Sequence, residues 1–275
     1  MIMVLVDGMP LASIPADDRG LAYGDGVFRT LAMRNGNPEL WSRQWEKLVA
    51  DCRALLLTPP VEADLLRDIS RIADEMPDCA LRITITRGSG GRGYDMPRDT
   101  QPRRVVAGSP LPQYPAAHQA RGIRARFCKL RLAPQPRLAG IKHLNRLENV
   151  LARAEWNDVS IAEGLLLDVD GNVIGGTRSN LFIAESDSLA TPDLSRCGVA
   201  GVTRDAVIDS ARGEGVSCHV EPIDRARLEA ADEIILVNSL IGAWTVAILE
   251  QRTRADFPMT ARVRKWLDAL RAPTP

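Results

Sequence analysis

One lysine of this chain stands where an irregular segment turns into a predicted helix. From Ile141 onward, apolar residues recur at spacings of three and four, as on one face of a helix: Ile141, Leu144, Leu147, Val150, Leu151 and Ala154. Pro134, Pro136 and Gly140 break any earlier helix, which puts Lys142 at the helix entrance. Desolvation beside a buried stripe would favour the neutral amine, a nucleophile or base. The alternative is that Lys142 is a solvated surface residue, as most lysines are.

Two glycine-rich segments in the first half could lie close to a ligand. Residues 87–94 read RGSGGRGY, in which backbone N–H groups can bind an anion and Arg87 or Arg92 can pair with a carboxylate. The segment lacks the Gly-Lys-Ser/Thr ending of a nucleotide-binding P-loop, and a flexible surface loop is the competing interpretation. Residues 23–30 read YGDGVFRT, where two glycines around Asp25 predict a tight turn.

Two segments in the second half could bind a phosphate. Residues 198–205, GVAGVTRD, predict a glycine-flanked turn that opens a helix. The free N–H groups of Val202 and Thr203, with the Thr203 hydroxyl, would then form an anion site. Asn238 and Ser239, between two apolar strands, form either a simple turn or further phosphate donors. A reactive lysine, a phosphate site and an arginine-rich loop together indicate pyridoxal phosphate.

Composition excludes several classes of protein. The 275 residues are 45% hydrophobic and 25% charged, as in a soluble globular protein, and the net charge of zero argues against nucleic acid or an anionic membrane as a partner. The N-terminus lacks the basic lead of a signal peptide. Five scattered cysteines predict reduced thiols in the cytoplasm, and three dispersed histidines predict no metal site. The most apolar stretch, 234–249, is interrupted by polar residues and predicts two strands instead of a membrane span.

The order of predicted elements favours an α+β fold with mixed sheets. Strands predominate without a regular βαβ alternation, and Asp170-Gly171 predicts a hairpin between two of them. Three prolines among small residues give 109–118 the composition of a linker, which we place at 111–118. We therefore expect an N-terminal α/β domain over 1–110 and a C-terminal domain over 119–275.

The segments LAGIKHLNRLENVL, RGSGGRGY and YGDGVF together resemble the fold-type IV pyridoxal-phosphate enzymes, most closely their aminodeoxychorismate lyase branch. The resemblance runs through nearly the whole chain. The first two segments are typical of the lyase branch, whereas YGDGVF and the Asn180–Phe182 triplet are shared with branched-chain and D-amino-acid aminotransferases.

The resemblance implies a homodimer whose subunits each have two α/β domains, with pyridoxal phosphate in the cleft between them. It implies conversion of 4-amino-4-deoxychorismate to 4-aminobenzoate and pyruvate, a step toward folate. Lys142 would hold the cofactor covalently and act as the general base, and Thr30 would assist departure of the enolpyruvyl group. The other positions that would bind the cofactor are Lys47, Arg178, Val202, Thr203, Asn238 and Ser239. The positions that would bind the substrate are Arg87, Arg92 and Tyr94.

The sequence departs from the family pattern at two positions. Lys47 stands where the family usually has a phosphate-binding arginine, so it brings charge without a bidentate fork. Gly175 stands where the family usually has a glutamate against the pyridine nitrogen, and Arg178 is an alternative group for that nitrogen. A cofactor without that carboxylate is a weaker electron sink. We expect a lyase, whose product is aromatic, to tolerate this loss better than an aminotransferase.

Two alternatives remain open at this stage. A D-amino-acid or branched-chain aminotransferase would share the cofactor and Lys142. A protein that binds pyridoxal phosphate without catalysis is a second alternative, because a fold does not determine a function.

Overall fold

The computed structural model describes residues 2–10, 13–97 and 100–271. The chain divides into two compact units. The first comprises residues 1–112 together with 141–145, and the second comprises residues 113–140 and 146–275. The segment that carries Lys142 therefore belongs to the first unit, although the chain on both sides of it belongs to the second. The domain boundaries expected from the sequence stay a prediction.

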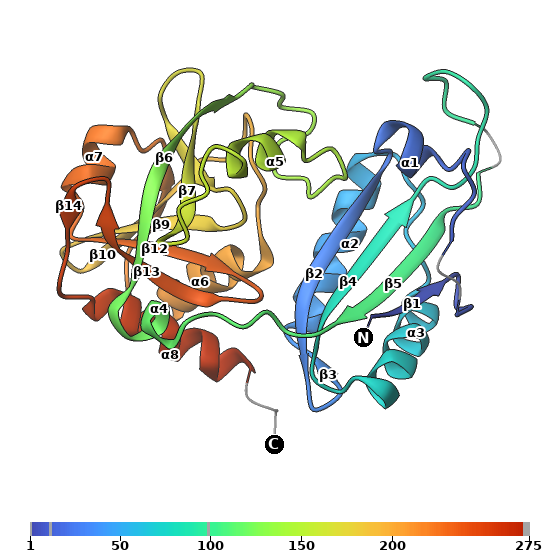
Figure 1. The fold of residues 1–275 in the computed structure, drawn as a ribbon, viewed down its shortest axis with the longest axis horizontal. Coiled ribbons are helices and arrows are strands. Elements are labelled where there is room, and N and C mark those ends of the chain that lie inside the picture. Colours follow the sequence, from blue (N-terminus) through green and yellow to red (C-terminus); the bar gives the residue numbers. More distant parts are fainter. Residues whose placement is uncertain (1, 11–12, 98–99, 272–275) are drawn as a thin grey trace. The chain divides into compact units, whose positions relative to one another are not determined.

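In its described part, the first unit is a five-stranded antiparallel sheet with the order β1-β5-β4-β2-β3. Alternate residues of the strands pack against α2 and α3, which lie on one face of the sheet (Figure 1), and form a buried core with them. The elements are β1 (Met3–Val6), α1 (Arg19–Tyr23), β2 (Gly26–Arg34), β3 (Asn37–Pro38), α2 (Trp41–Ala54), α3 (Glu62–Glu75), β4 (Cys79–Thr86) and β5 (Arg103–Ser109).

In the described part of the second unit, nine strands form a mixed sheet. The pairs β6–β7, β6–β13 and β10–β11 are parallel, and the others are antiparallel. The elements are α4 (Ala116–Arg121), β6 (Ile123–Leu132), α5 (Leu147–Arg153), β7 (Ile161–Asp168), β8 (Val173–Gly176), β9 (Asn180–Glu185), β10 (Ser188–Pro192), α6 (Val202–Gly213), β11 (Cys218–Glu221), α7 (Arg225–Ala230), β12 (Glu233–Asn238), β13 (Gly242–Leu249), β14 (Arg252–Thr253) and α8 (Pro258–Arg271).

These sheets confirm the predicted α+β class. The turn at Asp170-Gly171 joins β7 to β8, and the apolar stretch 234–249 forms β12 and β13 as expected. The predicted linker 111–118 includes the first turn of α4. Within residues 2–10, 13–97 and 100–271, none of the helices has both the length and the apolarity that a membrane crossing requires.

The helix expected from Ile141 is wrong over its first part, since α5 begins only at Leu147. The predicted buried stripe is also wrong: Leu147, Val150 and Leu151 are 73%, 59% and 59% exposed. Spacings of three and four fit a helix, but Ile141 is buried in the core of the first unit because its segment pairs with a strand. The apolar pattern thus spanned two different structures.

Candidate active site

Lys142 lies on a short extended segment along the edge of β2. The N–H of Phe28 donates to the Lys142 carbonyl at 3.0 Å, and the N–H of Leu144 donates to the Gly26 carbonyl at 3.0 Å. Gly24 precedes this pairing in a left-handed conformation with φ of 66°, and an added Cβ there would collide with Asn145. The glycine of YGDGVF therefore lets the lysine segment approach the strand.

The Lys142 amine lies over an aromatic ring. Its Nζ is 4.6 Å from the ring centroid of Phe28, and the guanidinium carbon of Arg82 is 4.1 Å from the same centroid. Thr30, on the same face of β2 as Phe28, is paired in register with Arg82 of β4. The structure thus gathers Lys142 with Phe28, Thr30 and Arg82 in one unit.

Lys47 and the buried carboxylate of Asp51 form an ion pair one turn apart on α2. Arg29 of β2 pairs with the same carboxylate from the sheet. The lysine expected at a phosphate therefore already has an anionic neighbour within its own helix.

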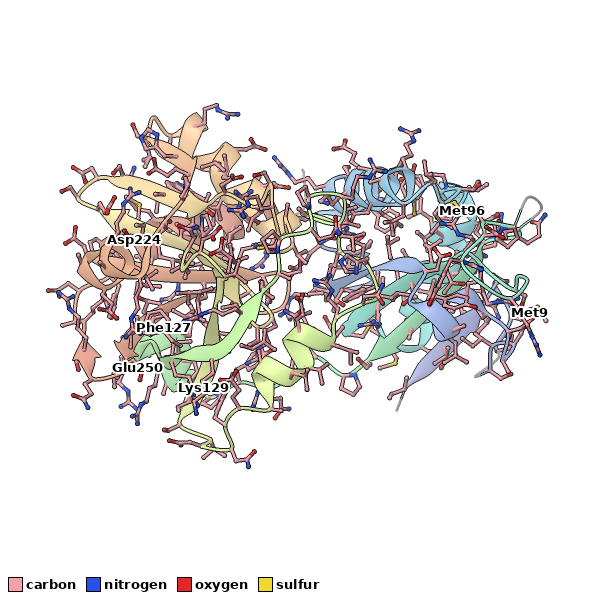
Figure 2. The ribbon with its side chains drawn as sticks, turned by 90° about the horizontal axis from the view of Figure 1, so that it is seen from above. Met9, Met96, Phe127, Lys129, Asp224 and Glu250 are labelled. Atoms are coloured by element: carbon pink, nitrogen blue, oxygen red, sulfur yellow. The ribbon has the colours of Figure 1, made fainter. Side chains whose placement is uncertain are left out.

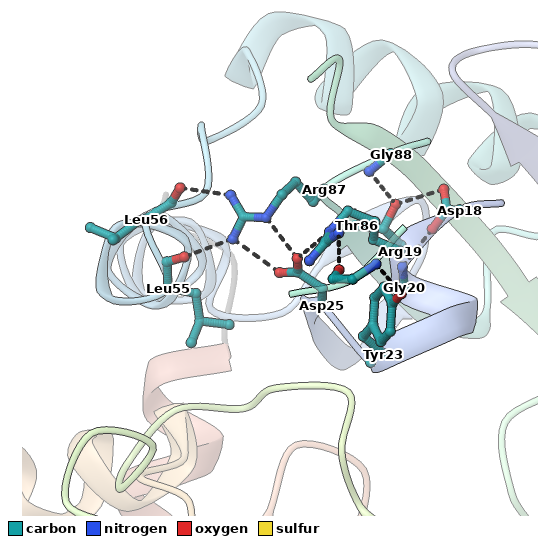
Figure 3. Close-up of polar contacts among 12 residues, drawn as sticks. Asp18, Arg19, Gly20, Tyr23, Asp25, Leu55, Leu56, Thr86, Arg87 and Gly88 are labelled. Carbon is teal, nitrogen blue, oxygen red and sulfur yellow. Dashed lines mark hydrogen bonds and ion pairs between the residues drawn. The ribbon is translucent and has the colours of Figure 1, made fainter. Parts of the chain in front are cut away.

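The two glycine-rich segments of the first unit meet through Asp25. Its carboxylate accepts from Nε and Nη2 of Arg87 at 2.7 and 3.0 Å and from Nε of Arg19 at 3.0 Å (Figure 3). Burial on its own would raise the pKa of Asp25. The hydrogen bonds and charges of Arg87 and Arg19 outweigh burial and hold that pKa below its usual range. Asp25 thus anchors the loop that follows Arg87.

The predicted substrate residues of the RGSGGRGY loop differ in their surroundings. Arg87 is buried and also donates to the carbonyls of Leu55 and Leu56, at 2.8 Å each. Its guanidinium is therefore largely committed to the protein. Arg92 is exposed, and Tyr94 is 89% exposed with its ring centroid 5.7 Å from that of Tyr23. The loop tip, at Arg92 and Tyr94, is the part that faces solvent.

The predicted phosphate residues of the second unit lie at the start of α6. Its N-cap is Gly201, which offers no capping side chain, so the first N–H groups of the helix are available. The hydroxyls of Thr203 and Ser239 are 3.3 Å apart. Asn180 accepts from the Gly201 N–H at 3.1 Å, and an added Cβ on Gly201 would collide with that amide. The structure therefore brings the predicted Val202, Thr203 and Ser239 together.

Asn238 shapes this site from the other side. Its side-chain oxygen accepts from the N–H groups of Leu240 and Ile241 at 2.8 and 2.9 Å, and its amide donates to the Arg178 carbonyl at 3.1 Å. Asn238 thus fixes the turn that carries Ser239 and ties it to the β8–β9 turn.

Glu163 of β7 is a buried carboxylate beneath the β8–β9 turn. It accepts from the Thr177 N–H at 3.1 Å and the Ser179 hydroxyl at 2.9 Å. The guanidinium of Arg178 lies 5.7 and 5.8 Å from the rings of Tyr114 and Trp244 and donates to the Ala162 carbonyl. Arg178 therefore has aromatic and backbone partners inside the second unit.

Gly175 lies in β8 just before this turn, where space is restricted. A Cβ on Gly175 would be 2.9 Å from the Ser179 carbonyl oxygen, and its φ is 158°. We expect Gly175→Ala to destabilise the fold by about 1–2 kcal/mol, because backbone atoms must move to admit the methyl group. Thermal unfolding measures this cost.

Gly175→Glu has the same steric cost and adds a carboxylate. With Gly175→Ala as the matched control, the glutamate variant is expected to show more transamination of amino acids than the alanine variant. Equal transamination in the two variants would contradict the interpretation of Gly175 as a missing acid.

Sequence reasoning did not single out Phe28, Arg82, Asp51 or Arg29. Phe28 and Arg29 stand within the segment YGDGVFRT, and Arg82 is one of two arginines in the alternating stretch LRITITR. Asp51 became recognisable only when the structure placed it beside Lys142.

Comparison with known proteins identifies the family. The family model "Amino-transferase class IV" matches residues 26–249. The chain belongs to the class IV aminotransferase family. Aminodeoxychorismate lyase of Vibrio harveyi is 36% identical over 265 residues, which are 96% of this chain and 97% of that protein.

Two solved structures of this family extend the comparison. 4-Amino-4-deoxychorismate lyase from Pseudomonas aeruginosa is 44% identical with a TM-score of 0.92, over 97% of this chain and 98% of that one. A hypothetical aminotransferase from Mycobacterium tuberculosis in its pyridoxal-phosphate-bound form is 26% identical with a TM-score of 0.84, over 98% and 99%. The class IV family thus includes both activities considered from the sequence.

Proposed function

We propose that this protein is a pyridoxal-phosphate-dependent lyase that converts 4-amino-4-deoxychorismate to 4-aminobenzoate and pyruvate. The observation that carries the proposal is the 44% identity, over 97% of this chain, to 4-amino-4-deoxychorismate lyase from Pseudomonas aeruginosa. The half-buried primary amine of Lys142 supports it chemically.

The donors of this chain fit the cofactor. Val202 and Thr203 offer backbone N–H groups at a helix start, and Thr203 and Ser239 offer hydroxyls, which together suit a phosphate. Lys142 follows Gly140 by two residues, and the backbone of Gly140 pairs with Gly198 and Ala200 just before α6. The similarity to a pyridoxal-phosphate-bound structure supports assigning the amine and the phosphate donors to one cofactor. We also assign Asn238 to the phosphate site because it holds the turn that carries Ser239.

The predicted cations have different supports. Lys47 brings positive charge, but it pairs with the Asp51 carboxylate, which also pairs with Arg29. Arg178, on the turn that Asn238 holds, stays a candidate for the pyridine nitrogen. For the substrate carboxylates we favour Arg92 over Arg87, because the guanidinium of Arg87 is committed to Asp25 and two carbonyls. Arg82 is a further candidate, since its guanidinium shares the Phe28 ring with Lys142. Tyr94 would contribute contact surface at the loop tip.

The roles of the side chains follow from the reaction. When bound, pyridoxal phosphate delocalises the electrons left on the substrate carbon that loses its proton. Lys142 would hold the cofactor covalently, and its Nζ, when free, would remove that proton as the general base. The same Nζ or the Thr30 hydroxyl supplies a proton to the departing enolpyruvyl oxygen. Arginine holds the carboxylates so that the carbon meets the amine.

An aminotransferase acting on D- or branched-chain amino acids is the second candidate, because class IV includes such enzymes. The test compares 4-aminobenzoate formation with amino-group transfer from a panel of those amino acids. We expect the lyase rate to exceed every transfer rate. A faster transfer from any member of the panel would favour the second candidate.

We further propose that the enzyme is a cytoplasmic homodimer. All five cysteines are free thiols, which agrees with a reducing compartment. The exposed apolar residues Leu147, Val150 and Leu151 of α5 form a stripe of the kind that interfaces bury.

The double variant Leu147→Ser and Leu151→Ser is expected to raise the dissociation constant of the dimer at least about tenfold. Each leucine that the interface buries contributes about 1.5–3 kcal/mol. Light scattering over a dilution series measures the dimer. The matched control is Val159→Ser, at an isolated valine that is 98% exposed. An unchanged dimer in the double variant would contradict the assignment of α5 to the interface.

A further inference from the structure

The carboxylate of Asp51 contacts the main chain of Lys142. Asp51 lies on the inner face of α2, is 2% exposed, and accepts a hydrogen bond from the Lys142 N–H at 3.1 Å. On the other side of the same residue, the Lys142 carbonyl accepts from the Phe28 N–H. The peptide of Lys142 is thus held between a helix and a strand.

Two cations pair with Asp51 in the core. Arg29 of β2, itself 2% exposed, and Lys47 of α2 both pair with the carboxylate. A buried carboxylate without such partners would cost several kcal/mol. Arg29 and Lys47 therefore compensate the charge of a carboxylate buried next to Lys142.

Fixing the main chain limits where the amine can go. With its N–H and its carbonyl both bonded, Lys142 moves mainly through its side-chain torsions, and its Nζ rests over Phe28. A well-placed amine is what proton removal from a substrate carbon requires.

We propose that Asp51 is a positioning residue for Lys142, with Arg29 as its compensating charge. Asp51 orients the peptide that carries the amine and places a negative charge against the main-chain N–H of Lys142. This inference rests on the proposed function in one respect, namely that Lys142 binds pyridoxal phosphate.

The other titratable groups around this position are cations or neutral. They are Arg29 of β2, Lys47 and Cys52 of α2, Arg82 of β4 and His143 next to Lys142. Burial raises the pKa of the Cys52 thiol to about 12, so that it stays neutral. Among these groups Asp51 is the carboxylate, and its removal takes away the local negative charge.

The test is Asp51→Asn in the whole protein loaded with pyridoxal phosphate. The amide keeps an oxygen for the Lys142 N–H but loses the charge. A proton on Nζ of Lys142 is then less stabilised, because a negative charge next to this residue has been removed. The pH midpoint of the cofactor's visible absorption band should therefore fall by about half a unit or more. The rate of 4-aminobenzoate formation should fall at least about tenfold.

Asp68→Asn is the matched control. Asp68 of α3 is as buried as Asp51, and it forms its ion pair and hydrogen bond with Arg104 of β5 at 2.5 Å, away from Lys142 along the sheet strand β5. We expect this variant to lose stability while the pH midpoint stays at the wild-type value. A merely structural role for Asp51 would make the two variants behave alike.

An Asp51→Asn midpoint equal to that of wild type would overturn the inference. If that variant does not fold, Asp51→Ser replaces it, because it removes the charge and leaves space, and the same downward shift is expected. A wild-type protein that shows a Lys142-dependent absorption band but forms no 4-aminobenzoate would contradict the proposed function. The comparison of pH midpoints would still test the role of Asp51. Absence of any Lys142-dependent band would overturn both.

Discussion

Replacing Lys142 with alanine is expected to lower the rate of 4-aminobenzoate formation about ten-thousandfold or more. The variant loses both the covalent attachment of the cofactor and the general base, because one amine serves both functions. Arg82, the other cation over Phe28, is a guanidinium that stays protonated and cannot take a proton from carbon. Product release measured by absorbance or chromatography reports the loss.

The control for this variant is a lysine outside the site. Lys129, labelled beside Phe127 on β6 in Figure 2, is exposed, and Lys129→Ala should keep wild-type activity. Borohydride reduction followed by peptide mapping should place the cofactor on the peptide that contains Lys142. Attachment at a different lysine, or near-normal turnover by Lys142→Ala, would contradict the assignment.

Thr203→Val is expected to weaken pyridoxal-phosphate binding about ten- to a hundredfold. Valine has nearly the shape of threonine, so the buried start of α6 keeps its packing while one hydroxyl donor to the phosphate is lost. A hydrogen bond to a charged group contributes about 1.5–3 kcal/mol, which corresponds to that range. Equilibrium titration of the apoprotein with the cofactor, followed by absorbance, measures the change.

Thr260→Val provides the comparison at another helix start. Thr260 lies in the first turn of α8, fully buried, and its hydroxyl donates to Glu233 at 2.6 Å. This variant should lose thermal stability but keep wild-type affinity for the cofactor. Equal affinities of Thr203→Val and the wild type would remove Thr203 from the phosphate site.

Much of the fold could be predicted because its signals are local. The apolar stretch 234–249 forms two strands, the Asp170-Gly171 pair turns a hairpin, and the glycine before Val202 precedes a helix. In each case the residues that specify the element are neighbours in sequence. The same locality made Val202, Thr203 and Ser239 recognisable as possible phosphate donors.

The surroundings of Lys142 could not be predicted because their partners are distant in sequence. Asp51 is ninety-one residues from Lys142. Asp25 and Arg87 are sixty-two residues apart, so the sequence did not indicate that their two glycine-rich segments are joined by an ion pair. The helix expected at Ile141 failed for the same reason, since pairing with β2 overrode the local apolar spacing.

The most direct test of the account is incubation of the purified, cofactor-loaded protein with 4-amino-4-deoxychorismate, with Lys142→Ala measured in parallel. We expect 4-aminobenzoate and pyruvate in equal amounts from the wild type and neither above background from the variant. A wild-type protein that holds pyridoxal phosphate on Lys142 yet releases no 4-aminobenzoate would contradict the lyase assignment.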